Sequence, residues 1–233
     1  MELTKEQLMI AKGHGFLPLK DGVHFSCRVI IPAGHITKEQ SNKISEICDK
    51  YGKSYYTLTQ RLDIEIPFIK YEDIESVKNE LKSIGLENGG TGKRVRPIHT
   101  CKGTVCKFGL IDTEKITNEM HKRFYKGYYD TVLPNKIRLG VGGCKNSCPK
   151  AQLSCIGVIG KKLNQVIITI GGTFGTSKII GKELKGVYTP EEALDIVERG
   201  IIFYKNNGID GERFFKMVDR LGFDTVQDAI LNK

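Results

Sequence analysis

The chain has 233 residues, with 39% hydrophobic and 27% charged residues, a composition that allows one large globular domain or two smaller lobes. Its formal net charge of +9 favours an anionic partner, but we expect no nucleic acid because no DNA- or RNA-binding signature accompanies the charge. The sequence contains no apolar run long enough to cross a membrane and begins without a secretory signal, so we expect a cytoplasmic protein whose seven cysteines form no disulfide framework.

The first part of the chain alternates helical and extended patterns, which predicts an α+β lobe. The predicted helices cover residues 4–12, 37–48 and 72–84, and the predicted strands cover residues 23–31 and 54–66. Three glycines among residues 88–92 indicate a flexible turn between two periodic regions. We therefore place the two lobes at residues 1–88 and 89–233.

The second part of the chain again mixes helical and strand patterns. Thr189 begins a capping box with proline at the first helical position, and Gly208 and Gly222 are expected to end helices. The predicted helices cover residues 112–125, 190–206 and 211–220, and the predicted strands cover residues 136–141 and 165–170.

Four of the cysteines form two close pairs, Cys101 with Cys106 and Cys144 with Cys148. Two short loops can bring four thiolates around one compact iron–sulfur cluster. Zinc also takes four cysteines, so the spacing alone leaves open a zinc-stabilised basic domain that binds nucleic acid. We expect the remaining cysteines, Cys27, Cys48 and Cys155, to be buried packing residues. Among the scattered histidines, only His99 lies close to a cysteine pair.

The residues around the second pair carry a family resemblance. From Leu133 the chain runs LPNKIRLGVGGCKNSCPKAQ, and residues 156–160 follow as IGVIG. This resembles the sirohaem-dependent sulfite and nitrite reductases, whose signature is LPRKFK, then GCPNSC, then an IG-hydrophobic-hydrophobic-G strand. Further matches stand in family order at residues 26–34, 58–61, 91–97 and 171–176. The chain resembles a small form of the family with a single copy of the repeated lobe pair.

The resemblance implies a fold and two cofactors. The expected fold class is α+β, with a ferredoxin-like lobe at residues 1–88 followed by a mixed α/β lobe at residues 89–233 that binds sirohaem and an iron–sulfur cluster. Cys101, Cys106, Cys144 and Cys148 would bind a 4Fe–4S cluster. The sulfur of Cys148 would also ligate the sirohaem iron and so couple the two centres.

The resemblance also implies an oxyanion substrate that is reduced by six electrons at the sirohaem. Arg28, Arg61, Lys136 and Arg138 would be the catalytic cations, because guanidinium forks bind oxygens and a lysine can also relay a proton. The macrocycle would be held by Arg96, Asn146, Gly172, Gly175, Thr176, Lys178 and Cys148. For the glycine-rich segment among these, a tight turn chosen only for its dihedral angles is an equal alternative.

The chain departs from the family pattern at three places. The first cysteine loop is one residue shorter than usual, and Asn135 stands where the family usually has arginine. Arg138 occupies a position where sulfite reductases commonly carry lysine and nitrite reductases often carry asparagine. A cation favours a dianion, so we expect reduction of sulfite to sulfide, with nitrite reduction to ammonia as the alternative. A sirohaem-binding electron-transfer subunit and an oxygenase of the cobalamin pathway remain further alternatives.

The resemblance finally implies partners. In two-copy relatives the substrate-facing cations and the cluster cysteines come from different copies, so a single-copy chain predicts a homodimer with composite sites. The sequence carries no nucleotide fingerprint for flavin or NAD(P)H. We therefore expect electrons from a ferredoxin or another donor protein.

Overall fold

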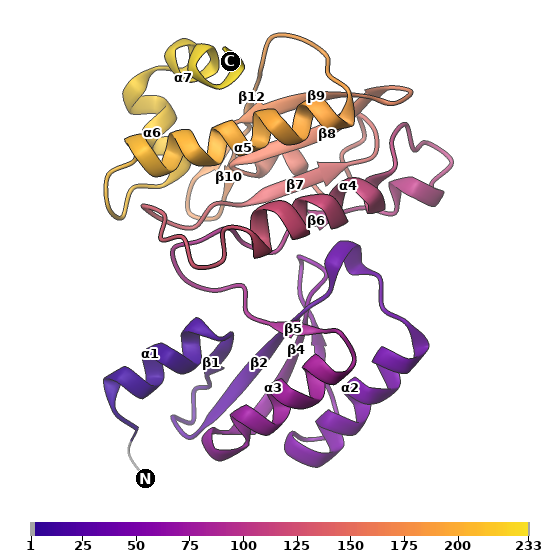
Figure 1. Ribbon diagram of the computed structural model, residues 1–233, viewed down its shortest axis with the longest axis vertical. Helices are drawn as coiled ribbons and strands as arrows, with labels where there is room; N and C mark the ends of the chain where they lie inside the picture. Colours follow the sequence, from indigo (N-terminus) through magenta and orange to yellow (C-terminus); the bar gives the residue numbers. More distant parts are fainter. Residues whose placement is uncertain (1–2, 233) are drawn as a thin grey trace. The chain divides into compact units, whose positions relative to one another are not determined.

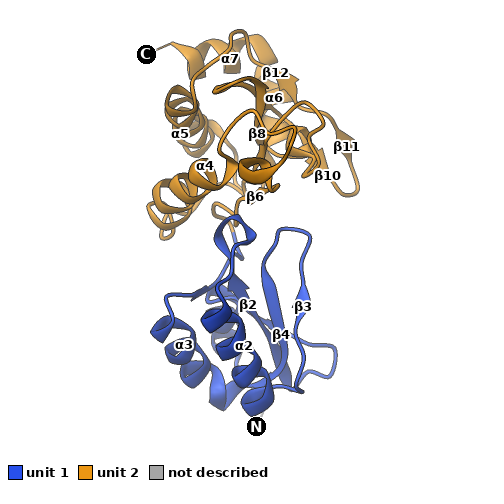
Figure 2. Ribbon diagram, turned by 90° about the vertical axis from the view of Figure 1, so that its right-hand side faces the viewer, with its two compact units in different colours: residues 1–92 blue, residues 93–233 orange. Residues whose placement is uncertain are grey.

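The computed structural model describes residues 3–232, and the chain divides into two compact units, residues 1–92 and 93–233 (Figure 2). The glycine-rich turn at residues 88–92 thus belongs to unit 1, whereas the sequence placed the border after residue 88. Each unit combines helices with a sheet of its own, which confirms the predicted α+β class. Within residues 3–232, none of the helices combines the length and apolar character that a membrane crossing requires.

Unit 1 is built on a five-stranded antiparallel sheet (Figure 1). Its strands are β1 (Phe16–Pro18), β2 (His24–Ile30), β3 (Thr57–Leu58), β4 (Ile64–Lys70) and β5 (Glu87–Asn88). The order is β1-β2-β4-β3, and β5 pairs with β2 beyond the end of β1, on the edge opposite β4. The central strands β2 and β4 bury five and three of their seven residues, and these form the base of the hydrophobic core.

The helices of unit 1 are α1 (Lys5–Gly13), α2 (Lys38–Tyr51) and α3 (Ile74–Ser83), with 3-10 turns η1 (Pro32–Gly34) and η2 (Tyr71–Asp73). Helices α2 and α3 lie together on one face of the sheet (Figure 1). Their apolar stripes supply fully buried Ile44, Ile47, Val77 and Leu81 to the core. Thr37 begins α2 with a capping box, at the start of the helix predicted at residues 37–48.

The strand predicted at residues 54–66 is wrong as one element, because the chain turns back within it. β3 and β4 are antiparallel neighbours joined by residues 59–63. Thr59 closes this turn, and Leu62 adopts a left-handed φ of 68°. Alternation of polar and apolar residues continues through both arms of such a hairpin, so the pattern alone does not reveal the turn.

Unit 2 is built on a second five-stranded sheet of order β12-β9-β8-β7-β6. Its strands are β6 (His99–Thr100), β7 (Leu139–Gly142), β8 (Ile156–Lys162), β9 (Gln165–Ile170) and β12 (Lys182–Glu183). β6, β7 and β8 run parallel, whereas β9 and β12 are added antiparallel. A separate hairpin consists of β10 (Thr173–Phe174) and β11 (Lys178–Ile179).

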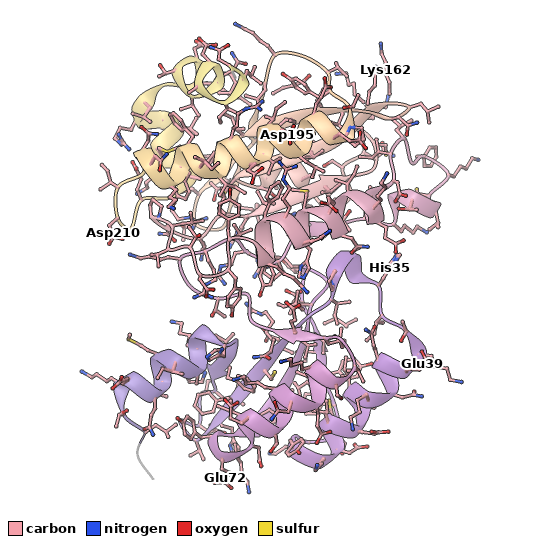
Figure 3. All side chains as sticks on the ribbon, viewed as in Figure 1. His35, Glu39, Glu72, Lys162, Asp195 and Asp210 are labelled. Carbon is pink, nitrogen blue, oxygen red and sulfur yellow. The ribbon has the colours of Figure 1, made fainter. Side chains whose placement is uncertain are left out.

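The helices of unit 2 are α4 (Thr113–Met120), continued by the π-helical segment η4 (His121–Lys126), α5 (Pro190–Asn207), α6 (Phe214–Leu221) and α7 (Phe223–Leu231), with 3-10 turns η3 (Gly103–Val105) and η5 (Ala151–Leu153). α4 and α5 cover the same face of the sheet (Figure 1). Asp195 on α5 is labelled in Figure 3. Arg123 on η4 joins the two helices through an ion pair of 2.8 Å with Asp195. Gly222 ends α6, as expected, and α7, which was not predicted, begins directly after it.

Candidate functional site

The two cysteine pairs follow neighbouring parallel strands. Cys101 comes directly after β6, and Cys144 comes two residues after β7. Thr100 at the end of β6 is in register with Val141 of β7. Because the carboxyl ends of parallel strands meet at one edge of a sheet, this topology brings the two loops together.

The four cysteines line one cavity of about 160 Å³. Asn146, which the sequence places among the cofactor-binding residues, also lines it. The other lining residues are Lys102, Gly103, Phe108, Gly109, Gly143 and Ser147. Residues 3–232 contain no group of three or more His, Cys, Asp or Glu side chains placed to hold one metal ion. A cavity ringed by four thiols is suited to a multi-atom iron–sulfur cluster, whose ligands stand around its faces.

The two loops touch through glycines. A Cβ built on Gly143 would lie only 2.8 Å from Gly103 Cα, and a Cβ on Gly103 would lie 2.9 Å from Gly143 Cα. The Gly143 N–H also donates a hydrogen bond of 3.3 Å to Cys101 Sγ. Such a bond stabilises a thiolate and helps to set the reduction potential of any cluster it ligates.

The first cysteine loop is tied to the start of α4. The Thr113 hydroxyl donates to the Cys101 carbonyl at 2.8 Å. The Thr104 hydroxyl donates to Asp112 at 2.7 Å, and Asp112 accepts the Lys115 N–H as the helix cap. These two hydrogen bonds, the backbone one first, lower the pKa of Asp112 and so keep the cap ionised. The shortened loop is therefore a braced structure.

The second cysteine loop is a tight turn. Ser147 has a left-handed φ of 42°, and its N–H donates to the Cys144 carbonyl at 3.0 Å. The Ser147 hydroxyl donates to Gln152 at 2.5 Å and accepts the Ala151 N–H at 3.1 Å. This network leaves Cys148 exposed, whereas the other three cysteines of the cavity are half-buried.

Arg138 lies against the β10–β11 hairpin. Its Nη1 donates to the Phe174 carbonyl at 3.1 Å, and the Lys150 ammonium lies 5.7 Å from the centre of the Phe174 ring. Three of the residues expected to hold the macrocycle, Gly175, Thr176 and Lys178, are exposed on this hairpin. The structure thus brings one predicted catalytic cation to the segment predicted to hold the cofactor.

Gly172 has a packing role. It is buried, and a Cβ there would lie 2.4 Å from each of the backbone carbonyl oxygens of Gln152 and Ser154. Only glycine permits this approach, so the close contact alone explains the residue. Its predicted contact with the macrocycle stays a prediction.

Arg96 and Lys136 lie on adjacent backbone segments of unit 2. Val95 forms a parallel bridge with Ile137, and the Arg96 N–H donates to the Ile137 carbonyl at 2.9 Å. Both side chains are half-buried. Their predicted roles toward cofactor and substrate stay predictions.

Arg28 and Arg61 lie in unit 1. Arg28 on β2 is in register with Glu65 on β4, and its Nε and Nη2 donate to Glu65 Oε1 at 2.9 and 2.5 Å. Its Nη1 donates to the Gly90 carbonyl at 3.2 Å. The Arg28 guanidinium is thus already bonded to a carboxylate. The sequence analysis, which expected its N–H groups to bind substrate, did not predict this partner. Arg61 is half-buried in the turn between β3 and β4.

Asp63 is a candidate that the sequence analysis missed. It is 1% exposed, and the backbone N–H of Ile31 is a hydrogen-bond donor to its carboxyl group. Burial raises the pKa of Asp63 to about 7, although Arg28 and Arg61 oppose this shift. The sequence signal that could have identified it is the position of an acidic residue two places after the predicted catalytic Arg61.

The other cysteines are buried, as expected. Cys27, Cys48 and Cys155 are at most 2% exposed, which confirms the prediction of packing. Burial raises the pKa of the Cys48 thiol to about 11 and also raises the pKa of Cys155, where Arg213 and Arg138 act in the opposite direction. His99 lies with Nε2 at 3.3 Å from the Ser154 hydroxyl.

Two family models match the chain. Residues 91–233 match the model described as the nitrite and sulphite reductase 4Fe-4S domain. Residues 17–84 match the nitrite/sulfite reductase ferredoxin-like half domain. The two matches together cover most of the chain, and the larger one contains all four cysteines of the cavity.

Individual relatives agree. An assimilatory-type sulfite reductase of Nitratidesulfovibrio vulgaris is 27% identical over 202 residues, which are 86% of this chain and 89% of that protein. A nitrite reductase (NAD(P)H) of Emericella nidulans is 27% identical over 212 residues, but these are only 19% of that protein. The solved structure of Mycobacterium tuberculosis NirA superimposes on 98% of this chain with a TM-score of 0.85 and 14% identity, covering 46% of that chain, and shows the shared fold.

Proposed function

The chain belongs to the nitrite and sulphite reductase family, and from that premise we propose that it is an oxidoreductase that reduces sulfite to sulfide with six electrons. The cofactors of the family are sirohaem and a 4Fe–4S cluster. The observation that carries the proposal is the set of four thiols around one cavity at the ends of β6 and β7. Cys101, Cys106, Cys144 and Cys148 would be the cluster ligands, and the exposed Cys148 would face the sirohaem.

When bound, the two cofactors supply the electron relay and the iron at which an oxyanion is reduced. The protein's part is to hold the anion and to deliver protons. Arg61 and Arg138 offer guanidinium donors in planar geometry, and Lys136 adds a mobile ammonium that can also give up a proton. Each oxygen that leaves the anion as water needs protons, so a lysine near the anion can both bind the anion and supply a proton.

The preference for sulfite rests on Arg138. A guanidinium at this position adds positive charge where a dianion gains more from it than a monoanion. Nitrite reduction to ammonia is the second candidate, because relatives named as nitrite reductases are as similar to this chain as the sulfite reductase is.

The deciding experiment is anaerobic turnover with reduced methyl viologen, run side by side on sulfite and nitrite. We expect sulfide from sulfite at the higher kcat/KM. Arg138→Asn should lower kcat/KM for sulfite more than for nitrite, and Lys161→Asn, a change of an exposed lysine on β8, is the matched control. A preparation that contains both cofactors but turns over neither anion would contradict the proposal and support an electron carrier.

A donor surface surrounds the cavity. Lys102, Lys107 and Lys145 are exposed on its two loops, and Val105 and Phe108 beside them are 78% and 60% exposed. Positive charges around an exposed apolar centre suit an acidic electron carrier of the ferredoxin type, since charge complementarity steers association and apolar contact holds the complex. A donor bound there would place its redox centre beside the cluster ligands.

Charge reversal tests this surface. Lys102→Glu with Lys107→Glu should reduce turnover with an acidic ferredoxin by about tenfold at low salt. Methyl-viologen turnover should stay unchanged, because a small donor needs no docking surface. Lys161→Glu with Lys162→Glu reverses two exposed charges on β8 and serves as control. Equal losses in both double variants would contradict the surface.

We further propose a homodimer with composite sites. The chain covers 46% of the NirA chain, so two copies approximate its length. Co-expression of an Arg61→Met chain with a Cys144→Ser chain provides the test. With composite sites, a purified mixed dimer has one intact site and about half the activity, whereas either homodimer is inactive. A fully active monomer, or an inactive mixed dimer, would contradict the proposal.

A further inference from the structure

The turn that carries Arg61 is held by its own hydrogen bonds. The N–H groups of Asp63 and Arg61 donate to the Thr59 hydroxyl at 3.1 and 3.3 Å. The Thr59 N–H donates to the Asp63 carbonyl at 2.9 Å. These bonds fix the relative positions of the Arg61 and Asp63 backbones.

A second loop packs onto this turn in a strained conformation. Ala33 and Leu62 both have left-handed φ values, 56° and 68°, although neither is glycine. Gly34 lies so close to Leu62 that a Cβ there would stand 2.8 Å from the leucine Cδ1. Such strain persists where the surrounding structure over-determines a position, and it gathers at functional sites.

Asp63 lies in the turn between β3 and β4 and is surrounded by charged side chains. Arg28 faces it from β2, Arg61 from the turn and Glu65 from β4, and the backbone of Ile31 faces it from the loop before Ala33. Asp63 is 1% exposed, and the backbone N–H of Ile31 is a hydrogen-bond donor that acts on its carboxyl group. Within a low-dielectric environment its charge acts on both guanidinium groups with little screening.

We propose that Asp63 is a positioning residue that makes oxyanion binding pH-dependent: protonated, it leaves the positive charge of Arg28 and Arg61 available, and ionised, it offsets that charge. The inference rests on the proposed function, in which Arg61 binds the anion, and it counts Arg28 as a charge beside Arg61. It adds to that function a residue that controls them without touching substrate.

The sign follows from the charges. Ionisation of Asp63 lowers the net charge of the group formed by Arg28, Arg61, Asp63 and Glu65 by one unit. The pKa of Asp63 is raised to about 7 by burial, so this change falls within the physiological range. Anion affinity should therefore fall as pH rises through about 7. One unit charge at about 10 Å and an effective dielectric of about 20 changes affinity on the order of tenfold.

The test uses nitrite as the anion, because nitrite does not titrate in this range and sulfite does. For the holoenzyme we expect KM for nitrite to rise on the order of tenfold between about pH 6 and about pH 8. Asp63→Asn should keep the low KM throughout, and Asp63→Glu should restore a pH dependence. Glu65→Gln should lower KM at every pH while the step remains, because Asp63 still titrates.

A second measurement separates this proposal from the proposed function. Carboxyl NMR of the full chain should show one signal that titrates near neutral pH and is missing in Asp63→Asn. If this signal is present and neither anion is turned over, the proposed function fails while the titration stands. If turnover is normal but Asp63→Asn keeps the wild-type rise in KM, or if no such signal exists, the role of Asp63 is overturned.

Discussion

Gly143→Ala should separate the two cysteine loops. The new Cβ would lie 2.8 Å from Gly103 Cα, 3.3 Å from Thr113 Cγ2 and 3.4 Å from Cys101 Sγ. Carbon atoms in good contact stand about 3.5–4.0 Å apart, so the loops must move by roughly 0.7 Å. The nearest atom belongs to the backbone, which cannot rotate away as a side chain can.

The magnitude follows from this overlap. Overpacking by one methyl group in a closely packed site costs about 1–3 kcal/mol. The same movement stretches the hydrogen bond from the Gly143 N–H to Cys101 Sγ, now 3.3 Å. We therefore expect Gly143→Ala to lose about 1–3 kcal/mol of unfolding free energy and to hold iron less firmly, because the two loops that carry the four thiols no longer meet.

The assay has two readouts. Urea unfolding of the chain gives the stability change, and the rate of iron loss to a chelator reports on the loops. Gly13→Ala is the matched control, because nothing lies within 4 Å of the Cβ it would introduce. Stability and iron retention like those of the control would refute the argument from close approach.

A double substitution sharpens the result. Gly103→Ala introduces a Cβ that lies 2.9 Å from Gly143 Cα, across the same contact. Once the methyl group at one position has separated the loops, the methyl group at the other position overlaps less with the facing backbone. The combined loss in Gly103→Ala with Gly143→Ala should therefore be smaller than the sum of the two single losses, and strict additivity would show that the loops move independently.

Three further changes have directions that the structure determines. The pKa of Asp63 is raised from 3.8 to about 7, so the stability contributed by the protonated carboxyl is fully present below pH 3.8 and is lost as pH rises through 7. Above this pH the unfolding free energy of Asp63→Asn should exceed that of the wild type by up to about 4 kcal/mol. Equal unfolding free energies of the two proteins at every pH, measured with urea, would contradict this prediction. Thr113→Val removes the hydrogen bond to the Cys101 carbonyl and should cost about 1 kcal/mol with faster iron loss. Arg123→Met removes the ion pairs with Asp195, a largely exposed partner, and with half-buried Glu198, and should cost about 1 kcal/mol in urea unfolding, with the loss reduced at high salt.

Helix starts were predictable because capping is local. Thr37 and Thr189 each stand three residues before Gln or Glu, and both capping boxes form in the structure. The helix after Gly222 was missed for the opposite reason. Gly222 has a φ of 85° and joins two helices, and α7 is held by burial of Val226 and Ile230, which are at most 1% exposed. That burial depends on neighbours distant in sequence, which a local stop signal does not report.

The candidate site likewise has features that local sequence predicts and features that depend on residues distant in sequence. The approach of the two cysteine loops was foreseeable, because four thiols in two short segments indicate one shared site, whether for an iron–sulfur cluster or for zinc. The environment of the cations was not. Arg28 and Glu65 are 37 residues apart, and their hydrogen bonds depend on strand register. Asp63 becomes informative only through its burial, which sequence spacing cannot supply.

The register that pairs Arg28 with Glu65 is itself set by a bulge. Across the irregular stretch of the β2–β4 ladder, β4 contains one residue more than β2. Pro67 has no N–H to donate there, and Phe68 takes a left-handed φ of 68°. Without the extra residue the ladder would place Arg28 opposite Ile66, and a one-residue slip moves side chains to the other face of a sheet. The charge balance around the proposed anion-binding arginines therefore depends on a backbone irregularity at Pro67 and Phe68, residues that carry no charge themselves.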